Sequence, residues 1–165
     1  DKNINGKSNF FKNTIANELD VNFNLEGIQF RGIIDRLDFN KELNEYTIHD
    51  YKTSKRIITP NKAKRDLQLG LYLIAIQKKF NAVNIKLKWH FLQYGIEVCV
   101  IPSEEDIDFI KSKLVSSAKN IVELSKEKHN FSPNETPLCY WCHYWEECTA
   151  KTTSNPAKRL PNANY

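Results

Sequence analysis

Three charged residues in two neighbouring segments have the types and spacing needed to hold a metal ion. Asp50 and Lys52 alternate at the end of an apolar segment, so on a β-strand their side chains point to the same side. Asp35 lies on the preceding apolar segment, and pairing of the two strands would bring it next to Asp50. Two adjacent carboxylates repel each other, and a divalent cation with oxygen ligands, Mg²⁺ or Mn²⁺, relieves that repulsion. A lysine beside such an ion can orient or activate water, or stabilise phosphate charge.

An alternative interpretation needs no metal. Asp35 and Asp38 would then pair with Arg31 and Arg36, and Lys52 would simply begin a basic loop. The segment from 52 to 65 holds six basic residues and no acidic one. Such a run is typical of a solvated loop, or of a surface that contacts phosphates; the candidate phosphate contacts are Lys55, Arg56, Lys62, Lys64 and Arg65.

The helix expected after this loop carries two polar residues on one face. Gln68 and Tyr72 are four residues apart, which places them together on a helix. A buried tyrosine with a glutamine neighbour is most often a packing feature, so this pair alone does not define a site.

Three of the four cysteines form a second cluster of potential ligands. They are Cys139, Cys142 and Cys148, interleaved with aromatic residues, while Cys99 lies apart on an expected strand. Thiolates at this spacing suit zinc or an iron–sulfur cluster. Cys99 as a fourth ligand, His143 in a zinc site, and free thiols are the alternatives, and a small buried side chain is the default for Cys99.

The elements that must position these residues follow from apolar periodicity. The order α-β-β-β-α-β-β-α predicts an α/β fold with a mixed sheet flanked by helices. Expected helices cover 8–19, 61–80 (capped by Asn61) and 104–128, and expected strands cover 21–25, 27–39, 46–52, 84–94 and 96–101. Ser103 and Asp106 have the spacing of a capping box. In β-strand 84–94 the apolar residues face one way, and Lys86, Lys88 and His90 face the other, towards solvent or a nucleic-acid channel.

Composition narrows the class of protein. The chain has 165 residues, 41% hydrophobic and 27% charged, a balance typical of a folded domain, and its net charge is +4. The longest apolar stretch, 69–76, is too short to cross a bilayer, and no signal peptide opens the chain, so we expect an intracellular, cytoplasmic protein. The absence of methionine, even at position 1, suggests a piece of a longer protein.

Three motifs, in order and spacing, resemble the RecB-like branch of the PD-(D/E)xK nucleases, which includes RecB, AddB and Cas4 proteins. They read GIIDRLD at 32–38, DYKTS at 50–54 and QLGLY at 68–72, and the resemblance covers about 21–149. It implies a restriction-endonuclease-like core followed by a cysteine-rich module. The expected divisions are 1–20 as an N-terminal helix left from a longer segment, 21–132 as the core, 133–149 as the module and 150–165 as a flexible tail.

The resemblance also assigns roles. Asp35 and Asp50 match the metal-binding acids, and the main-chain carbonyl of Tyr51 matches the third metal ligand. Lys52 matches the motif lysine. Gln68 and Tyr72 match a motif near the active site and the DNA. The implied reaction is hydrolysis of phosphodiester bonds with Mg²⁺ or Mn²⁺, by exonuclease action on single-stranded DNA ends.

The chain departs from the family pattern in two places. Many members carry a metal-binding histidine on an upstream helix, but here the histidines lie at or after position 49, and the helix expected at 8–19 offers only Glu18. Glu26 is a possible substitute, although a surface role suits it better. In the family, a cysteine upstream of the nuclease motifs joins the C-terminal three to hold a [4Fe–4S] cluster, and this chain has none there.

The sequence therefore predicts a DNA nuclease for recombination, repair or CRISPR adaptation, with a helicase or other proteins of those processes as possible partners. The alternative is a catalytically silent DNA-binding or scaffolding domain stabilised by an iron–sulfur or zinc site.

Overall fold

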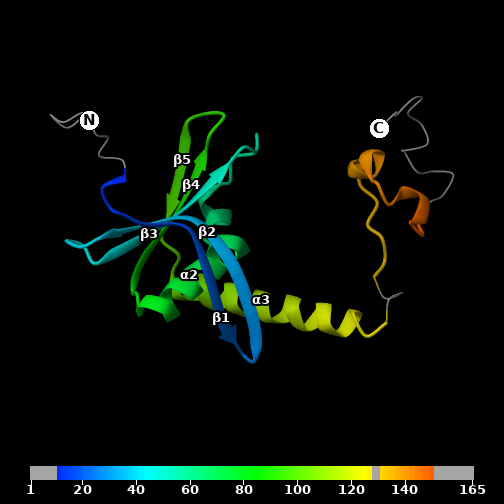
Figure 1. Ribbon diagram of the computed structural model, residues 1–165, viewed down its shortest axis with the longest axis horizontal. Coiled ribbons are helices and arrows are strands. Elements are labelled where there is room, and N and C mark those ends of the chain that lie inside the picture. The colour runs from blue at the N-terminus through cyan, green and yellow to red at the C-terminus, as the bar shows by residue number, and fades with distance from the viewer. Residues whose placement is uncertain (1–10, 128–130, 151–165) are drawn as a thin grey trace. The chain divides into compact units, whose positions relative to one another are not determined.

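The structure is a computed structural model, and it describes residues 11–127 and 131–150. The chain forms two compact units, residues 1–119 and 120–165. The boundary between these two units falls within the last long helix of the chain. It does not fall in the segment 133–137, which contains prolines. Figure 1 shows the elements of the first unit, a five-stranded sheet with helices. Its strands are β1 (Thr14–Leu25), β2 (Ile28–Asn40), β3 (Glu45–Lys52), β4 (Asn84–Phe91) and β5 (Ile96–Val100).

The sheet is mixed, as the sequence predicts. Its spatial order follows the chain, β1-β2-β3-β4-β5. The first three strands form an antiparallel meander, β3 and β4 run parallel, and β4 and β5 are antiparallel. The parallel pair needs a long connection, and residues 53–83 supply it with the helices α1 (Pro60–Ala63) and α2 (Leu67–Phe80).

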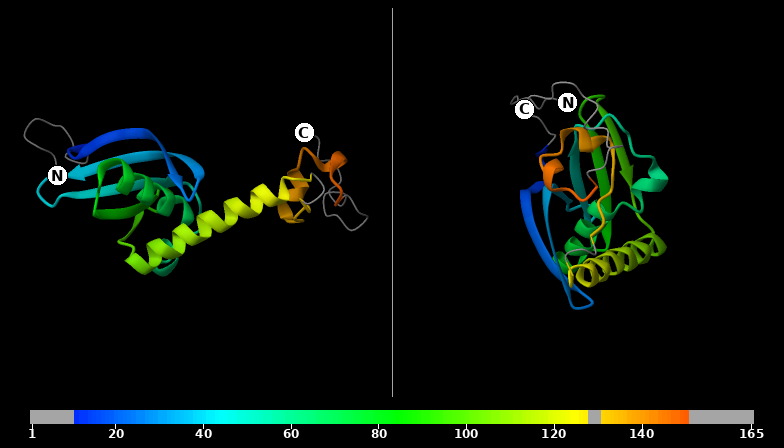
Figure 2. Two further views of the ribbon diagram at one scale, coloured as in Figure 1. Left: turned by 90° about the horizontal axis from the view of Figure 1, so that it is seen from below. Right: turned by 90° about the vertical axis from the view of Figure 1, so that its right-hand side faces the viewer.

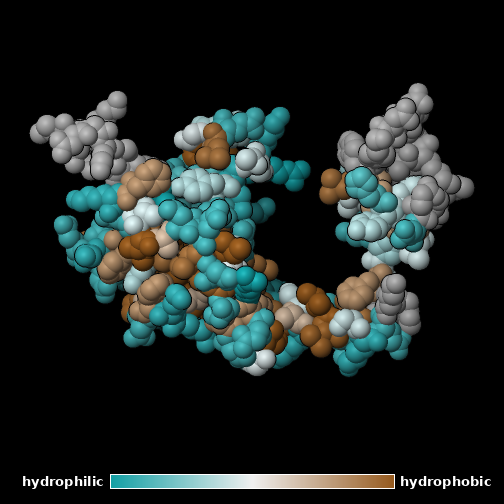
Figure 3. Space-filling model, in the orientation of Figure 1, coloured by the Kyte–Doolittle hydropathy of each residue, from teal (hydrophilic) through white to brown (hydrophobic). Residues whose placement is uncertain are grey.

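The hydrophobic core lies between the sheet and α2, which packs against one sheet face (Figure 2). Ile48, Leu87 and Trp89 on the central strands are buried, as are Leu73 and Ile76 on the helix. The alternation predicted for β4 is confirmed, because Ile85, Leu87, Trp89 and Phe91 are all buried. Figure 3 shows one face of this unit, on which hydrophilic and hydrophobic residues are interspersed.

Helix α3 (Glu104–Leu124) begins as the sequence predicts. The Ser103 hydroxyl accepts from the Asp106 backbone N–H at 3.2 Å, and the Asp106 carboxylate accepts from the Ser103 backbone N–H at 3.1 Å. This is the expected capping box, and it gives two backbone N–H groups at the helix start a side-chain partner. Where α3 crosses α2, a Cβ on Gly70 would lie 2.7 Å from Ile110 side-chain atoms, so only glycine allows this close approach.

The helix predicted over 8–19 is wrong. Residues 14–19 belong to β1, and residues 8–10 lie outside the described part of the chain. The apolar residues Phe11, Ile15 and Leu19 have helical spacing, but Leu19 also begins a period-two series that continues through buried Val21 and Phe23. The long β2 strand pairs with residues from Thr14 onward. This pairing outweighs local helical preference.

Two further expectations need correction. The helix predicted over 61–80 is two helices, because Lys64 and Arg65 form a turn, and Asp66, rather than Asn61, caps α2 by accepting from the Leu69 N–H at 2.9 Å. Cys99, expected to be buried, is exposed. The register pairs it with Lys88 on the solvent-facing side, while its neighbour Val100 is buried.

The second unit, in its described part, contains two short 3-10 helices, η3 (Pro137–Trp141) and η4 (Trp145–Glu147). The Thr136 hydroxyl accepts from the Leu138 N–H and so caps η3. The tail predicted from residue 150 lies outside the described residues except for Ala150. Among the described helices, none is long and apolar enough to cross a membrane.

Candidate active site

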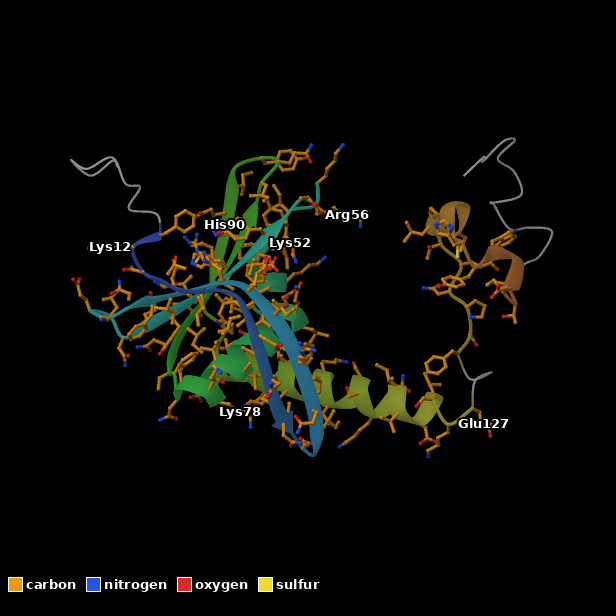
Figure 4. All side chains as sticks on the ribbon, viewed as in Figure 1. Lys12, Lys52, Arg56, Lys78, His90 and Glu127 are labelled. Carbon is orange, nitrogen blue, oxygen red and sulfur yellow. The ribbon has the colours of Figure 1, made fainter. Side chains whose placement is uncertain are left out.

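The Lys52 side chain stands at the centre of a line of polar groups at the end of β3 (Figure 4). Its ammonium nitrogen lies 2.7 Å from Asp50 Oδ2 and donates to Gln68 Oε1 at 2.9 Å. The Gln68 amide in turn donates to the Tyr72 hydroxyl at 3.4 Å. The expected shared side of Asp50 and Lys52 is confirmed, and so is the shared helical face of Gln68 and Tyr72. The structure brings all four of these residues together.

Asp35 reaches the same place from β2. The last ladder pair between β2 and β3 is Arg36 with His49, so the next positions along, Asp35 and Asp50, are neighbours as the sequence predicts. The Asp35 carboxylate accepts from the Tyr51 backbone N–H at 2.9 Å. The N–H and C=O of one strand residue point to the same edge of the strand. The Tyr51 carbonyl therefore faces the side on which Asp35 lies, away from β4.

The Asp50 carboxylate lies in an environment that disfavours its charged form. It is 3% exposed, and burial raises its pKa, while Lys52 opposes that change and the charges of Asp35 and Asp66 add to it. Asp66 is a third acid of this neighbourhood that the sequence analysis did not single out. Its only sequence signal is its place just before an apolar helix, which predicts a cap and nothing more.

This donor set fits a hard divalent cation. Two carboxylates from adjacent strands and a main-chain carbonyl facing the same way are the oxygen ligands that Mg²⁺ and Mn²⁺ prefer. The repulsion that raises the pKa of Asp50 is relieved by such a cation. Asp35, Asp50 and the Tyr51 carbonyl would hold it, with Lys52 beside them.

Gly32 on β2 allows helix α2 to come close to this site. A Cβ at this position would lie 2.5 Å from Tyr72 Cε1 and 3.3 Å from Leu71 Cδ2. The Tyr72 ring is buried, with little room to move. The glycine that opens the first motif therefore sets where the tyrosine of the third motif lies.

The predicted phosphate contacts divide into two groups. Lys55, Arg56, Lys62 and Lys64 are exposed, and Arg56 extends outward beyond Lys52 in Figure 4. Arg65 instead pairs with Asp106 at 2.7 Å and Glu105 at 2.8 Å, and its guanidinium lies over the Phe109 ring. Arg65, which is also exposed, therefore fastens the α1–α2 turn to the start of α3, and a contact with phosphate would compete with these ion pairs.

The metal-free interpretation of the first motif holds only for Arg36 and Asp38, which both lie within that motif. Arg36 pairs with Asp38, Nε to Oδ1 at 3.1 Å, whereas Arg31 pairs with Asp20 and not with Asp35. Glu26 is exposed on the β1–β2 turn and pairs with Lys119 at 3.3 Å, which matches the surface role expected for it.

A cluster of polar and charged side chains on β2 to β5, buried at its centre, was missed by the sequence analysis. We call it the back-face cluster, and its members are Arg36, Asp38, His49, Tyr51, His90 and Glu97. His49 precedes Asp50 and so faces the other side of the strand. Burial and the Arg36 charge lower the pKa of His49 to about 4, and burial lowers the pKa of His90. The His49 imidazole is therefore neutral at pH 7.

The sequence hardly indicates this cluster, because its members lie on four strands and come together only when those strands pair. His90, expected on a solvent or channel face, is buried, although Lys86 and Lys88 on the same face are partly exposed and pair with Glu45 and Glu97. Only the alternation of polar residues with apolar ones pointed to a shared face.

Of the three clustered cysteines, Cys139 lies in η3, Cys142 directly follows η3 and Cys148 directly follows η4, and all are free thiols. Cys139 Sγ accepts from the Thr136 backbone N–H at 3.4 Å. Within residues 11–127 and 131–150, no group of three or more histidine, cysteine or acidic side chains is arranged to hold a metal ion. The thiols have the right chemistry for zinc or iron, but their described arrangement does not form such a site.

A solved structure described as "Crystal structure of SSO0001" is similar, with a TM-score of 0.49 and 20% sequence identity, over 84% of this chain and 61% of that one. No curated protein matches. The family model described as "PD-(D/E)XK nuclease superfamily" matches residues 7–149, which include the sheet, α2 and every residue of the candidate active site. This chain belongs to the PD-(D/E)XK nuclease superfamily, whose members are metal-dependent nucleases.

Proposed function

We propose that the chain is a DNA nuclease of the RecB-like branch, an exonuclease that acts on single-stranded ends in recombination, repair or CRISPR adaptation. The observation that carries the proposal is the contact of Lys52 with both Asp50, at 2.7 Å, and Gln68, at 2.9 Å, with Asp35 beside them. These contacts join residues of all three sequence motifs in one place. Structural ion pairs alone would not require that convergence.

Each residue has a part in hydrolysis of a phosphodiester. Asp35, Asp50 and the Tyr51 carbonyl hold the cation, which when bound supplies Lewis-acid polarisation of the phosphate oxygens. Lys52 orients the attacking water or stabilises negative charge that develops on the phosphate. Gln68 fixes the ammonium of Lys52, and Tyr72 supports Gln68. Lys55, Arg56, Lys62 and Lys64 are exposed cations suited to contact the nucleic-acid backbone.

The cysteine-containing unit has a separate role in this proposal. Cys139, Cys142 and Cys148 are assigned to a structural [4Fe–4S] cluster, or to zinc, completed by a ligand outside the described residues. The spacing of the thiols and the C-terminal position after the core support this assignment. No part of the nuclease chemistry depends on it.

The proposed activity is tested with end-labelled DNA and Mg²⁺ or Mn²⁺. We expect the chain to shorten linear single-stranded DNA progressively from an end and to leave circular single-stranded DNA intact. Lys52→Ala should reduce the rate by about a hundredfold to a thousandfold, as expected when a main transition-state contact is removed. Lys78→Ala, which removes an exposed lysine from the last turn of α2, is the matched control and should retain activity.

Three results would count against the proposal. Equal cleavage by the Lys52→Ala variant would show that Lys52 is wrongly assigned. Cutting of circular DNA would show that the chain acts as an endonuclease and not as an exonuclease. Absence of cleavage by the folded parent chain with either metal would favour the silent DNA-binding domain.

A further inference from the structure

The back-face cluster connects four strands by one series of hydrogen-bonding contacts. Asp38 Oδ2 on β2 lies 3.1 Å from His49 Nε2 on β3. His49 Nδ1 lies 2.8 Å from His90 Nε2 on β4, and His90 Nδ1 lies 2.9 Å from Glu97 Oε1 on β5. One side chain from each of four successive strands takes part, so the series fixes the strands laterally in addition to their backbone ladders.

Burial of this cluster needs an explanation beyond folding. Arg36, His49 and His90 are 2%, 3% and 6% exposed. Removing charged and polar groups from water is costly, and apolar side chains of similar volume usually stabilise a fold as well or better. Apolar side chains could therefore cover the sheet face opposite α2 at a smaller cost in folding free energy. Retained buried polar networks of this kind often fix one particular geometry.

Tyr51 connects the cluster to the candidate active site. Its hydroxyl accepts from Arg36 Nη1 at 2.8 Å, and its ring stacks on His90 with centroids 4.8 Å apart. The backbone N–H of the same residue donates to the Asp35 carboxylate at 2.9 Å. Tyr51 lies between Asp50 and Lys52 in the chain, so a displacement of its peptide would move the groups on either side.

We infer that Arg36, Tyr51 and His90 are positioning residues for the metal-binding groups of the opposite sheet face. The cluster holds the Tyr51 side chain, and the Tyr51 peptide then orients the Asp35 carboxylate, the adjacent Asp50 and its own carbonyl. This inference rests on the proposed function, because it assumes that those oxygens bind the cation. Outer residues that orient metal ligands commonly change metal affinity or activity by about tenfold to a hundredfold when they are replaced.

Two conservative variants test the inference. Tyr51→Phe removes only the hydroxyl that accepts from Arg36, and His90→Phe keeps a stacked ring but removes the contacts with His49 and Glu97. Tyr94→Phe makes the same chemical change as the first variant at an exposed tyrosine of the β4–β5 turn, and is the matched control. The full chain is used throughout.

The main measurement is Mn²⁺ binding without DNA, by titration calorimetry or by electron paramagnetic resonance of the free ion. We expect Tyr51→Phe and His90→Phe to weaken Mn²⁺ binding by about tenfold. The Mn²⁺ concentration for half-maximal cleavage should rise by the same factor, with cleavage recovering at excess Mn²⁺. Binding of a single-stranded oligonucleotide without metal should be unchanged, and Tyr94→Phe should match the parent.

The outcomes separate the inference from the function on which it rests. Normal Mn²⁺ affinity in both variants, with an active parent, overturns the positioning role and leaves the nuclease standing. A parent that binds no Mn²⁺ and does not cleave overturns both. If Mn²⁺ binding weakens only to the extent that the unfolding temperature falls, the loss of binding comes from loss of structure, and the inference is overturned. If one of the two variants does not fold, the other variant decides.

Discussion

Two side chains hold the Lys52 ammonium in position: Asp50, its ionic partner, and Gln68, which is neutral. The ammonium lies between Asp50 and the Gln68 carbonyl oxygen, and the latter sits in the first turn of α2. An ion pair alone constrains a lysine weakly, because its four-carbon side chain has many rotamers. The second contact limits that freedom and holds the ammonium where a phosphate would meet it.

Replacement of Gln68 tests this at the residue scale. Gln68→Ala should reduce the cleavage rate by about tenfold to a hundredfold, since small displacements of a catalytic group have effects of that size. Gln68 is exposed, so the free energy of unfolding should change by no more than about 0.5 kcal/mol. Single-turnover kinetics and urea unfolding measure the two quantities.

Gln77→Ala, on the same helix but away from Lys52, is the matched control for Gln68→Ala. If both variants cleave at the parent rate, the hydrogen bond from Lys52 to Gln68 has no part in orienting the ammonium.

Among the elements, α3 is attached to the sheet unit by its first turn. The Asp106 carboxylate caps the helix through Ser103 and accepts from Arg65 Nε at 2.7 Å. Hydrogen bonds from Arg65 and then Ser103 lower the pKa of Asp106 from 3.8 to about 2. Because Arg65 lies in the turn between α1 and α2, this carboxylate connects the crossover helices to α3.

The lowered pKa of Asp106 predicts how the free energy of unfolding depends on pH. Its pKa is lower in the folded than in the unfolded chain, so its stabilisation is complete above about pH 5 and disappears as the pH falls from about 4 to 2. Asp106→Asn should lower the free energy of unfolding at pH 7 by about 1–2 kcal/mol, and the difference from the parent should shrink through that acid range. Urea unfolding at a series of pH values measures it.

Asp108→Asn is the control for this experiment, because Asp108 is an exposed acid on the same helix paired only at 3.3 Å with Lys111. A constant difference between the Asp106→Asn variant and the parent from pH 7 to pH 2 would contradict the assignment.

Elements and site were predictable to different degrees. The strands β2 to β5, the start of α3 and the convergence of Asp35, Asp50 and Lys52 followed from alternation and spacing, which depend on neighbours in the chain. The first strand did not, because Phe11, Ile15 and Leu19 fit a helix equally well and only the long partner β2 decides. The back-face cluster was also beyond reach, since His49 and His90 meet only once β3 and β4 pair in register.

At the scale of the whole molecule, the chain comprises two compact units, and the clustered cysteines belong to the second. The first unit contains all the residues that we assign to hydrolysis. The second contributes thiols whose described arrangement does not form a metal site. Its predicted cluster is therefore a property that can be tested without any measurement of nuclease activity.

Metal analysis of the intact chain makes that test. Protein prepared without oxygen should contain iron and sulfide and show a brown absorbance, and Cys142→Ser should remove all three. Zinc without sulfide would identify the alternative site. Cys99→Ser, which replaces the exposed cysteine of β5, should change none of these values. Absence of both metals, with Cys139, Cys142 and Cys148 all reactive towards a thiol reagent in the folded protein, would contradict the prediction.

The parallel pairing of β3 with β4 also has a consequence for how the protein folds. The meander of β1, β2 and β3 joins segments close in the chain, whereas pairing of Asp50 with Trp89 must first close the loop formed by residues 53–83. Closing a long loop costs entropy before its contacts are gained, so non-local pairings slow folding. Asp35 and Asp50 therefore meet within the meander, while Lys52 meets Gln68 only when the crossover docks. The candidate active site is thus completed by one of the slower steps of folding, and a nascent chain holds its acidic pair before it can hold its lysine in place.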